Sequence, residues 1–258
     1  MEKISDIIYE DQNFKCLKIG KIGIMKIKNN VFKIITSLNE YEKFIGYMNV
    51  LESDKSISAI VFFNEKRALG NEEFKNYLKN ITTDEANDDA FNKLRILNNE
   101  TRNRKHIIIN NIISHIIRSK KIIVNAADGE IVTPFFGAAL AADLRLASEE
   151  TKFILSHSQM NIHPTGAVPY FLPKYLGHAK ASQILLVSDK ITAKEALDLG
   201  LVYEVLPAEN YEEQCLEVVN KIISRGDTAI KSTIKMLAYN FQDLVEYTNM
   251  EECEYAAI

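Results

Sequence analysis

The stretch of sequence that decides the fold is residues 120–177, which read KKIIVNAADGEIVTPFFGAALAADLRLASEETKFILSHSQMNIHPTGAVPYFLPKYLG. It begins with an apolar run of strand length, 121–126, and Asp128-Gly129 marks the turn that follows. Pro134 suits the first turn of a helix, because its missing N–H is not needed there. The small residues 137–142 let that helix lie close against a neighbouring element.

The second half of the stretch predicts two short strands, a loop and a helix. The strands are 144–147 and 152–155, and the helix is expected over 165–176. The loop between them is broken by Pro and Gly and carries His157 and His163. Histidine titrates near neutral pH and is therefore suited to proton transfer. We expect any chemistry of this protein to lie in this stretch.

Upstream, the sequence predicts the order strand–strand–helix–strand. Residues 14–28 alternate in polarity around a central turn, as two paired strands do, and 31–35 is expected to be a third strand. Ser37 to Glu40 fits a capping box, which opens a helix that runs to about Glu52. Residues 57–63 read ISAIVFF, a continuous apolar run that is typical of a strand buried on both faces.

Residues 64–104 give the weakest pattern. They are polar and rich in Asn, Asp and Glu, with short helical pieces at 72–79 and 88–97. Long segments of this kind are often functional or disordered, so a mobile loop or lid is expected. Residues 105–119 return to strong helical periodicity, and their apolar face must pack against another element.

Helical segments dominate the last part of the chain. A helix is expected over 179–187, and Thr192 to Glu195 fits a second capping box, which opens a short helix that ends at Gly200. A strand follows at 202–206, and the chain is expected to be helical from Glu209 onward. The strand–strand–helix order recurs along the chain without any repeat in the sequence itself.

The composition is ordinary for a globular protein of one large domain. Of the 258 residues, 47% are hydrophobic and 26% are charged. The net charge of −4 argues against a nucleic-acid-binding protein. Two basic clusters, 102–106 and 118–121, fit either solvated helix ends or a site for an anionic ligand such as a nucleotide phosphate.

The sequence favours a cytoplasmic protein that does not enter a membrane. No apolar run approaches the ~18 residues of a membrane span, and the N-terminus lacks the apolar region of a signal peptide. The cysteines are far apart and show no metal-ligand spacing, so we expect reduced thiols and no metal. They are Cys16, Cys215 and Cys253.

Two segments resemble the crotonase family, the enoyl-CoA hydratase/isomerase superfamily. KKIIVNAADG at 120–129 is similar to the strand and turn that lead into that family's oxyanion helix. ITAKEALDLGLVYEVLP at 191–207 is similar to the segment after its active site. Asp143 falls where the family has an Asp at the end of the oxyanion helix, and LPKYLG at 172–177 follows in register. The resemblance is good over 107–207.

The resemblance implies an α/β fold, with a spiral of β-β-α units over 1–200 and a C-terminal helical region over 201–258 that builds trimers. It implies an acyl-CoA or carrier-bound thioester as partner, no cofactor beyond the CoA of the substrate, and a homotrimer or dimer of trimers. In the family, two backbone N–H groups hold the thioester oxygen as charge develops, and such a donor is worth about 2.7–4 kcal/mol. Carboxylates then move protons at the neighbouring carbons.

The sequence departs from the family's pattern at the positions that carry the chemistry. The family's second oxyanion donor lies in a Gly-Gly-Gly run, which here reads Thr133-Pro134-Phe135, and Pro134 has no N–H to donate. The family's two catalytic glutamates align with Gly137 and His157. The first donor is expected near Gly70-Asn71, where GNEEF is similar to the family's Gly-Ala-Asp-Leu.

Three functions fit this sequence. In the first, the protein is an enzyme of the hydratase/isomerase type, a lyase or isomerase, in which His157 carries the proton with help from His163. In the second, it is a non-catalytic binding or scaffold homologue. In the third, it decarboxylates a carrier-bound polyketide thioester, which needs enolate stabilisation but no carboxylate base. Each histidine also fits a structural role, bonded to the backbone.

We expect a divergent enoyl-CoA hydratase/isomerase-like protein that binds acyl-CoA thioesters without the usual pair of catalytic glutamates. The catalytic candidates are His157 and His163. Glu130 and Thr133 border the same region and fit turn or capping roles. The candidate substrate-binding residues are Gly70, Asn71, Pro134, Phe135, Gly137 and Thr165.

Overall fold

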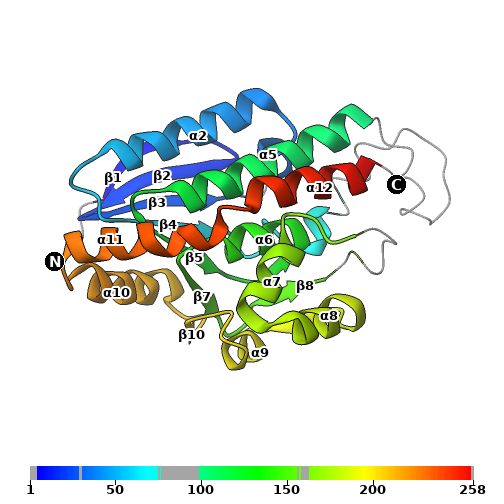
Figure 1. Ribbon diagram of the computed structural model, residues 1–258. Helices are drawn as coiled ribbons and strands as arrows, with labels where there is room; N and C mark the ends of the chain where they lie inside the picture. The colour runs from blue at the N-terminus through cyan, green and yellow to red at the C-terminus, as the bar shows by residue number, and fades with distance from the viewer. Residues whose placement is uncertain are drawn as a thin grey trace.

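The computed structural model describes residues 5–28, 31–74, 76, 99–155, 157 and 163–256. Their strands and helices form a mixed α/β architecture, as the sequence predicts (Figure 1). Within the expected loop or lid, only its first part and the start of the next helix are described, and the helical piece predicted at 88–97 lies outside the described residues. No helix in the described part of the chain is both long and apolar enough to cross a membrane.

A seven-stranded sheet is the centre of the fold. In order across the sheet, its strands are β1 (Ser5–Glu10), β2 (Phe14–Ile19), β3 (Ile22–Ile27), β4 (Ala59–Asn64), β5 (Ile122–Ala127), β7 (Leu144–Ser148) and β10 (Glu204–Leu206). The pairs among β1, β2 and β3 are antiparallel, and every pair from β3 onward is parallel. The loops after β4 and β5 therefore leave the same edge of the sheet, where open α/β sheets bind their ligands.

A second sheet of three short strands leads into α6. Its strands are β6 (Glu130–Val132), β8 (Lys152–Ile154) and β9 (Lys190–Thr192). The sequence predicted β8 but missed β6 and β9, because three residues give no periodicity to read. Gly129 makes the turn between β5 and β6 with φ +76°, and a Cβ there would lie 2.1 Å from the Lys66 carbonyl oxygen. Only glycine fits this turn.

Helices cover both faces of the main sheet. They are α1 (Val31–Ile34), α2 (Leu38–Ser53), α5 (Asn99–Arg118), α6 (Thr133–Leu140), α7 (Val168–Leu176), α8 (His178–Val187), α9 (Ala193–Asp198), α10 (Tyr211–Ile223), α11 (Asp227–Leu237), the 3-10 helix η1 (Ala238–Phe241) and α12 (Leu244–Ala256). On β4, Ile60 and Phe62 join the core with α2, α5 and α6, whereas Val61 and Phe63 join the core under α10. This confirms the prediction of a strand buried on both faces.

The prediction of a third strand at 31–35 is wrong. Residues Val31–Ile34 form the short helix α1, and Val31, Phe32 and Ile34 of this helix are all buried in the core. The β-branched and aromatic residues favour a strand, but strand propensity depends on packing context and is readily overridden. The missed strand β1 pairs with β2 at the edge of the sheet.

The two helix starts predicted from capping boxes are confirmed. The side chain of Ser37 accepts the backbone N–H of Glu40 at the start of α2. At the start of α9, the side chain of Glu195 accepts the N–H of Thr192 at 2.8 Å, and the Thr192 hydroxyl accepts the N–H of Glu195. The sequence signature therefore locates two helix starts to the residue.

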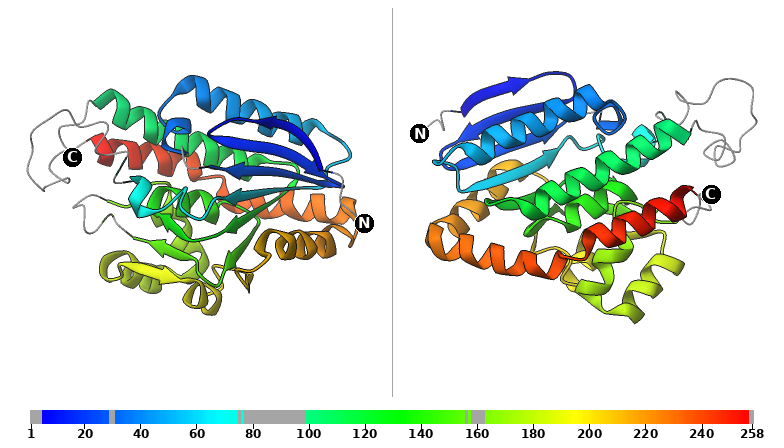
Figure 2. Two further views of the ribbon diagram at one scale, coloured as in Figure 1. Left: turned by 180° about the vertical axis from the view of Figure 1, so that it is seen from behind. Right: turned by 45° about the horizontal axis from the view of Figure 1, so that its top comes forward.

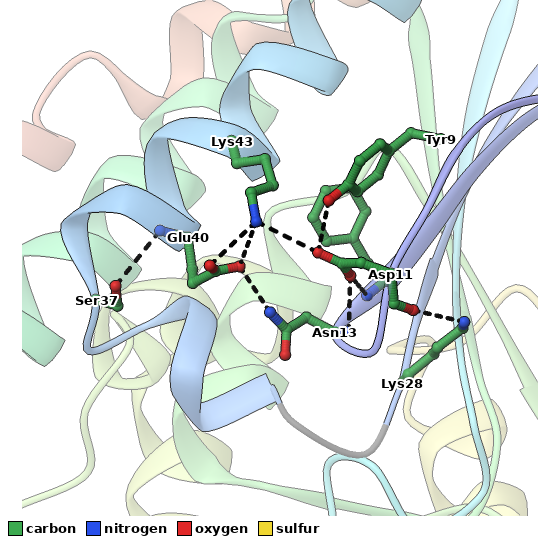
Figure 3. Close-up of polar contacts among 8 residues, drawn as sticks. Tyr9, Asp11, Asn13, Lys28, Ser37, Glu40 and Lys43 are labelled. Atoms are coloured by element: carbon green, nitrogen blue, oxygen red, sulfur yellow. Dashed lines mark hydrogen bonds and ion pairs between the residues drawn. The ribbon is translucent and has the colours of Figure 1, made fainter.

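A polar network holds the start of α2 to the turn between β1 and β2 (Figure 3). Asn13 Nδ2 donates to Glu40 Oε2 at 2.6 Å, and Lys43 Nζ lies 3.0 Å from the same oxygen. Lys43 also lies 3.5 Å from Asp11 Oδ2, which accepts the hydroxyl of Tyr9 at 2.8 Å. These contacts fix α2 over one face of the sheet.

The C-terminal helices return along the outside of the core. Figures 1 and 2 show α12 lying beside α5, and the helical region after residue 209 matches the predicted helical end of the chain. The division of the chain between residues 200 and 201 stays a prediction. β10, which follows that boundary, pairs with β7 in the main sheet.

Candidate functional site

β6 and the first turn of α6 form one side of the candidate site. Val132 N–H donates to the Leu69 carbonyl at 2.9 Å, which ties the loop after β4 to this strand. Thr133 and Pro134 then begin α6, with no side-chain cap at the preceding Val132. Pro134 stands at the position that the family resemblance assigns to the second oxyanion donor, and it has no N–H.

The first expected donor already has an acceptor. Residues 71–74 form a helical turn after Gly70, and the backbone N–H of Asn71 donates to Glu130 Oε2 at 3.3 Å. A Cβ on Gly70 would lie 3.2 Å from the Cβ of Glu130, so the close approach of the two segments leaves little room for a side chain at Gly70. Glu130 therefore caps the helical turn, in agreement with its predicted capping role.

Gly137 and Gly166 pack backbone against backbone. A Cβ on Gly137 would lie 1.6 Å from the Gly166 carbonyl oxygen, and a Cβ on Gly166 would lie 2.5 Å from the Pro134 carbonyl oxygen. Gly166 and Ala167 both adopt positive φ, at +75° and 56°, and Ala167 N–H donates to Glu251 Oε1 at 3.1 Å. The space in which the family's first glutamate side chain would begin is filled by this chain's own backbone.

His157 is 4% exposed and bonded to the backbone of α8. Its Nε2 lies 3.0 Å from the Leu185 carbonyl, which can only accept, so Nε2 carries the proton. Its Nδ1 lies 3.4 Å from the hydroxyl oxygen of Thr133, and that hydroxyl donates to the Ile154 carbonyl. Burial lowers the pKa of His157, so the neutral ring is favoured.

The other predicted residues of this loop lie close to the Gly166 turn. His163 Nδ1 lies 3.2 Å from the Pro164 carbonyl oxygen and donates to it. Thr165 is 7% exposed. Burial is the main cause of the lowered pKa of His157 and of His106, and the charge of His163 lowers both further. The structure thus places His163 near enough to His157 for a charge on His163 to lower the pKa of His157.

A buried polar cluster between α5 and α12 was missed from the sequence. His106 and Glu251 are each 2% exposed, with His106 Nε2 at 3.6 Å from Glu251 Oε2. Asn110 Nδ2 lies 3.0 Å from the same ring nitrogen. Burial raises the pKa of Glu251 to about 8 and lowers that of His106 to about 4, so the pair is neutral near pH 7. No local motif marks the pair, because the two residues meet only when α12 docks.

An apolar cavity of about 80 Å³ lies beside α6. Leu69, Phe135, Ala138 and Ile112 are among its walls, and the Phe135 ring packs against Phe32 with centroids 5.5 Å apart. Phe135, a predicted binding residue, therefore lines a cavity next to both donor positions. In the described part of the chain, no group of three or more His, Cys, Asp or Glu side chains could hold a metal ion.

The chain belongs to the enoyl-CoA hydratase/isomerase family. The family model described as Enoyl-CoA hydratase/isomerase matches residues 90–254. This match includes α6, the histidine-bearing loop and the C-terminal helices. It confirms the family that the sequence motifs indicated.

Curated relatives are about a quarter identical to this chain over the aligned residues. A trans-2-decenoyl-[acyl-carrier-protein] isomerase of Streptococcus mutans is 27% identical over 146 residues, which cover 56% of this chain and 55% of that protein. Enoyl-CoA delta isomerase 2 of Rattus norvegicus is 26% identical over 154 residues, 60% of this chain and 39% of that protein. The human Chromodomain Y-like protein is 26% identical over 57% of this chain and 24% of its own length. The chain thus spans about half, or less, of these relatives.

Solved structures match the fold over almost the whole chain. An enoyl-CoA hydratase from Bacillus anthracis superposes with a TM-score of 0.73 at 19% identity, covering 96% of this chain and 91% of that chain. One from Polaromonas sp. JS666 gives a TM-score of 0.72 at 21% identity, covering 94% and 90%. These likenesses confirm the predicted crotonase fold.

Proposed function

We propose that this protein binds acyl thioesters, such as acyl-CoA, but does not hydrate them by the two-glutamate route. One observation carries the proposal: neither oxyanion position offers a free donor. Asn71 N–H is donated to Glu130, and Pro134 has no N–H. An enzyme that stabilises an enolate gains rate only from donors that act in the transition state.

The apolar cavity beside α6 supports the binding part of the proposal. Its walls at Leu69 and Phe135 adjoin the two donor positions, so an acyl group placed there has its thioester close to Asn71. Its volume of about 80 Å³ accommodates only a few carbons, since one water takes up about 30 Å³ of liquid. We infer a short acyl group, with CoA or a carrier protein as its bearer.

A double-bond isomerase is the second candidate. Isomerisation moves a proton between two carbons, so one acid/base group is enough. The neutral His157, with an unprotonated Nδ1 at 3.4 Å from Thr133, offers such a group. Two relatives bear isomerase names. In this candidate His157 is the proton carrier, and a positive charge on His163 lowers the pKa of the His157 ring further.

We also infer a cytoplasmic homotrimer or dimer of trimers. Exposed apolar side chains on the C-terminal helices support this assembly, because such side chains mark interaction surfaces when they cluster. They are Met236, Leu237, Tyr239, Val245 and Met250, from 48% to 70% exposed. Light scattering on the purified chain tests the assembly, and a monomer at micromolar concentration contradicts it.

Calorimetry with crotonyl-CoA, butyryl-CoA and free CoA tests the binding proposal. We expect the acyl thioesters to bind more tightly than free CoA, because only they fill the apolar cavity.

Incubation with 3-enoyl-CoA tests the isomerase candidate, with His157→Gln as the variant, since glutamine can still donate to the Leu185 carbonyl. Release of CO2 from a carrier-bound malonyl-type thioester identifies a decarboxylase instead. Absence of binding by every thioester contradicts the proposal and favours a scaffold.

A further inference from the structure

A second, larger cavity lies at the C-terminal end of α5. It has a volume of about 710 Å³, within the range of small-molecule binding sites. Its walls come from the last turns of α5, from the link to β5, and from α11, η1 and α12. These elements lie side by side in Figures 1 and 2. The cavity shares no lining residue with the apolar cavity beside α6.

Four cationic side chains line this cavity. Arg118 and Lys120 come from the end of α5 and the following link, and Lys231 and Lys235 stand one turn apart on α11. No Asp or Glu is among the lining residues. Within the described residues, no ion pair involves Arg118, Lys120 or Lys235. Like charges gathered around one hollow favour a bound anion.

The neighbouring Lys121 has a structural role, in contrast to Arg118 and Lys120. It is 6% exposed, and its Nζ donates to the carbonyls of Asp54 and Ile57 at 2.9 and 2.7 Å. The basic cluster at 118–121 therefore has two parts. Lys121 holds the fold together, whereas the exposed Arg118 and Lys120 face the cavity.

The rest of the cavity wall is largely apolar. Ile234 and Leu244 are 9% and 3% exposed, and Phe241 is anchored against Phe171 with ring centroids 5.6 Å apart. A ligand that matches this wall has an apolar body and an anionic head, because cations and apolar side chains both line the cavity.

We propose that this cavity binds an amphiphilic phosphate, with its phosphate among Arg118, Lys120 and Lys235 and its alkyl part on Ile234, Phe241 and Leu244. A phosphate with a charge near −2 matches several cations better than a carboxylate does. Arginine and lysine both recognise phosphate, arginine in bidentate fashion and lysine as a point charge. The site is separate from the proposed thioester site and does not depend on it.

A tryptophan reporter tests this site directly. The chain has no tryptophan, so Phe241→Trp places a single indole in the cavity wall. Its fluorescence is followed during titration with octyl phosphate, octanoate and octanol. We expect octyl phosphate to bind at least about tenfold more tightly than octanoate, because the phosphate carries more negative charge at neutral pH, and uncharged octanol to bind most weakly.

A charge-matched pair of double variants completes the test. In the reporter background, the double variant Arg118→Gln with Lys235→Gln is expected to weaken the binding of octyl phosphate by about tenfold or more. The affinity for octanol is expected to stay within about twofold of its original value. Lys180→Gln with Lys190→Gln removes the same charge from exposed positions on α8 and β9 and is expected to change neither. Equal affinity for octyl phosphate and octanol overturns the proposal. So does a loss of the native oligomeric state in the Arg118/Lys235 variant without any ligand effect, which marks the cavity as an interface between copies.

Discussion

The Glu130 carboxylate accepts a hydrogen bond from the backbone N–H of Asn71 at 3.3 Å. This contact joins β6 to the helical turn after Gly70, 59 residues earlier in the chain. A carboxylate at this N–H disfavours a second negative oxygen nearby, because like charges repel. The pair thus joins the two segments, and the Asn71 N–H, which the family resemblance predicts as the first oxyanion donor, is already bonded.

Removal of the carboxylate is expected to open the Asn71 donor. Glu130→Ala should tighten butyryl-CoA binding by about threefold to tenfold, as measured by calorimetry, because the thioester gains one hydrogen bond. It should also lower the free energy of unfolding by about 0.5–1.5 kcal/mol, since a capping bond is lost. The matched control is Glu217→Ala on the exposed face of α10. Unchanged affinity for butyryl-CoA in Glu130→Ala contradicts the role given to this contact.

The backbone contact at Gly137 predicts that a glutamate cannot be restored there. Gly137→Ala, and still more Gly137→Glu, should lower the free energy of unfolding by about 3 kcal/mol or more, because the Gly166 carbonyl leaves no room for a Cβ. Gly46 on α2 is the control, since a Cβ there meets nothing within 4 Å. Gly46→Ala should stabilise the protein by up to about 1 kcal/mol in urea unfolding. Hydration of crotonyl-CoA by a folded Gly137→Glu variant contradicts this account.

The buried pair between α5 and α12 gives stability a predictable pH dependence. The pKa of Glu251 is raised to about 8 in the fold, so the native state holds more protons than the unfolded state between about pH 4.5 and 8. The pKa of His106 is lowered to about 4, which has the opposite effect between about pH 4 and 6.5. Lys105 and His163 lie near the same pair. Stability should therefore fall as pH rises from 6.5 to 8.

Glu251→Gln tests this dependence in urea unfolding across that pH range. Glutamine keeps an acceptor for Ala167 N–H but does not ionise, so the variant should lose the downward slope of up to about 1.4 kcal/mol per pH unit. Glu254→Gln, on the exposed side of α12, should keep it. A wild-type stability that rises between pH 7 and 8 is inconsistent with a neutral buried Glu251.

The state of His157 is open to direct measurement by NMR. We expect its pKa below 6.5 and the Nε2–H tautomer, because the ring is buried and its Nε2 faces the Leu185 carbonyl. The ring resonances are assigned by comparison with His157→Gln. A pKa above 7 means that the ring is charged at neutral pH, which removes the unprotonated Nδ1 on which the isomerase candidate rests.

The sequence was sufficient for those elements whose signal is local. The run at 57–63 predicted β4, and the capping boxes at Ser37 and Thr192 predicted the starts of α2 and α9. The prediction of a strand at 31–35 is wrong because the strand propensity of these residues is overridden by packing against the core. β6 and β9 are too short for any periodicity to appear.

The sequence predicts where the candidate site departs from the family's pattern. It does not predict which residues of the site contact one another. Pro134 and Gly137 were visible in the sequence, since each lacks a group that the family uses. The contacts of Glu130 with Asn71 and of Glu251 with Ala167 join residues 59 and 84 positions apart, which no local pattern reveals. Only the folded chain shows that the Glu130 and Glu251 carboxylates accept the backbone N–H groups of Asn71 and Ala167.

We propose that this protein binds acyl thioesters without hydrating them. The most direct measurement combines calorimetry with crotonyl-CoA and an assay of its hydration on the same sample. We predict saturable binding, tighter than that of free CoA, and a hydration rate no faster than in the absence of protein. Rapid hydration of bound crotonyl-CoA by the wild-type chain contradicts the account, because it requires a working oxyanion hole where Glu130 and Pro134 now stand.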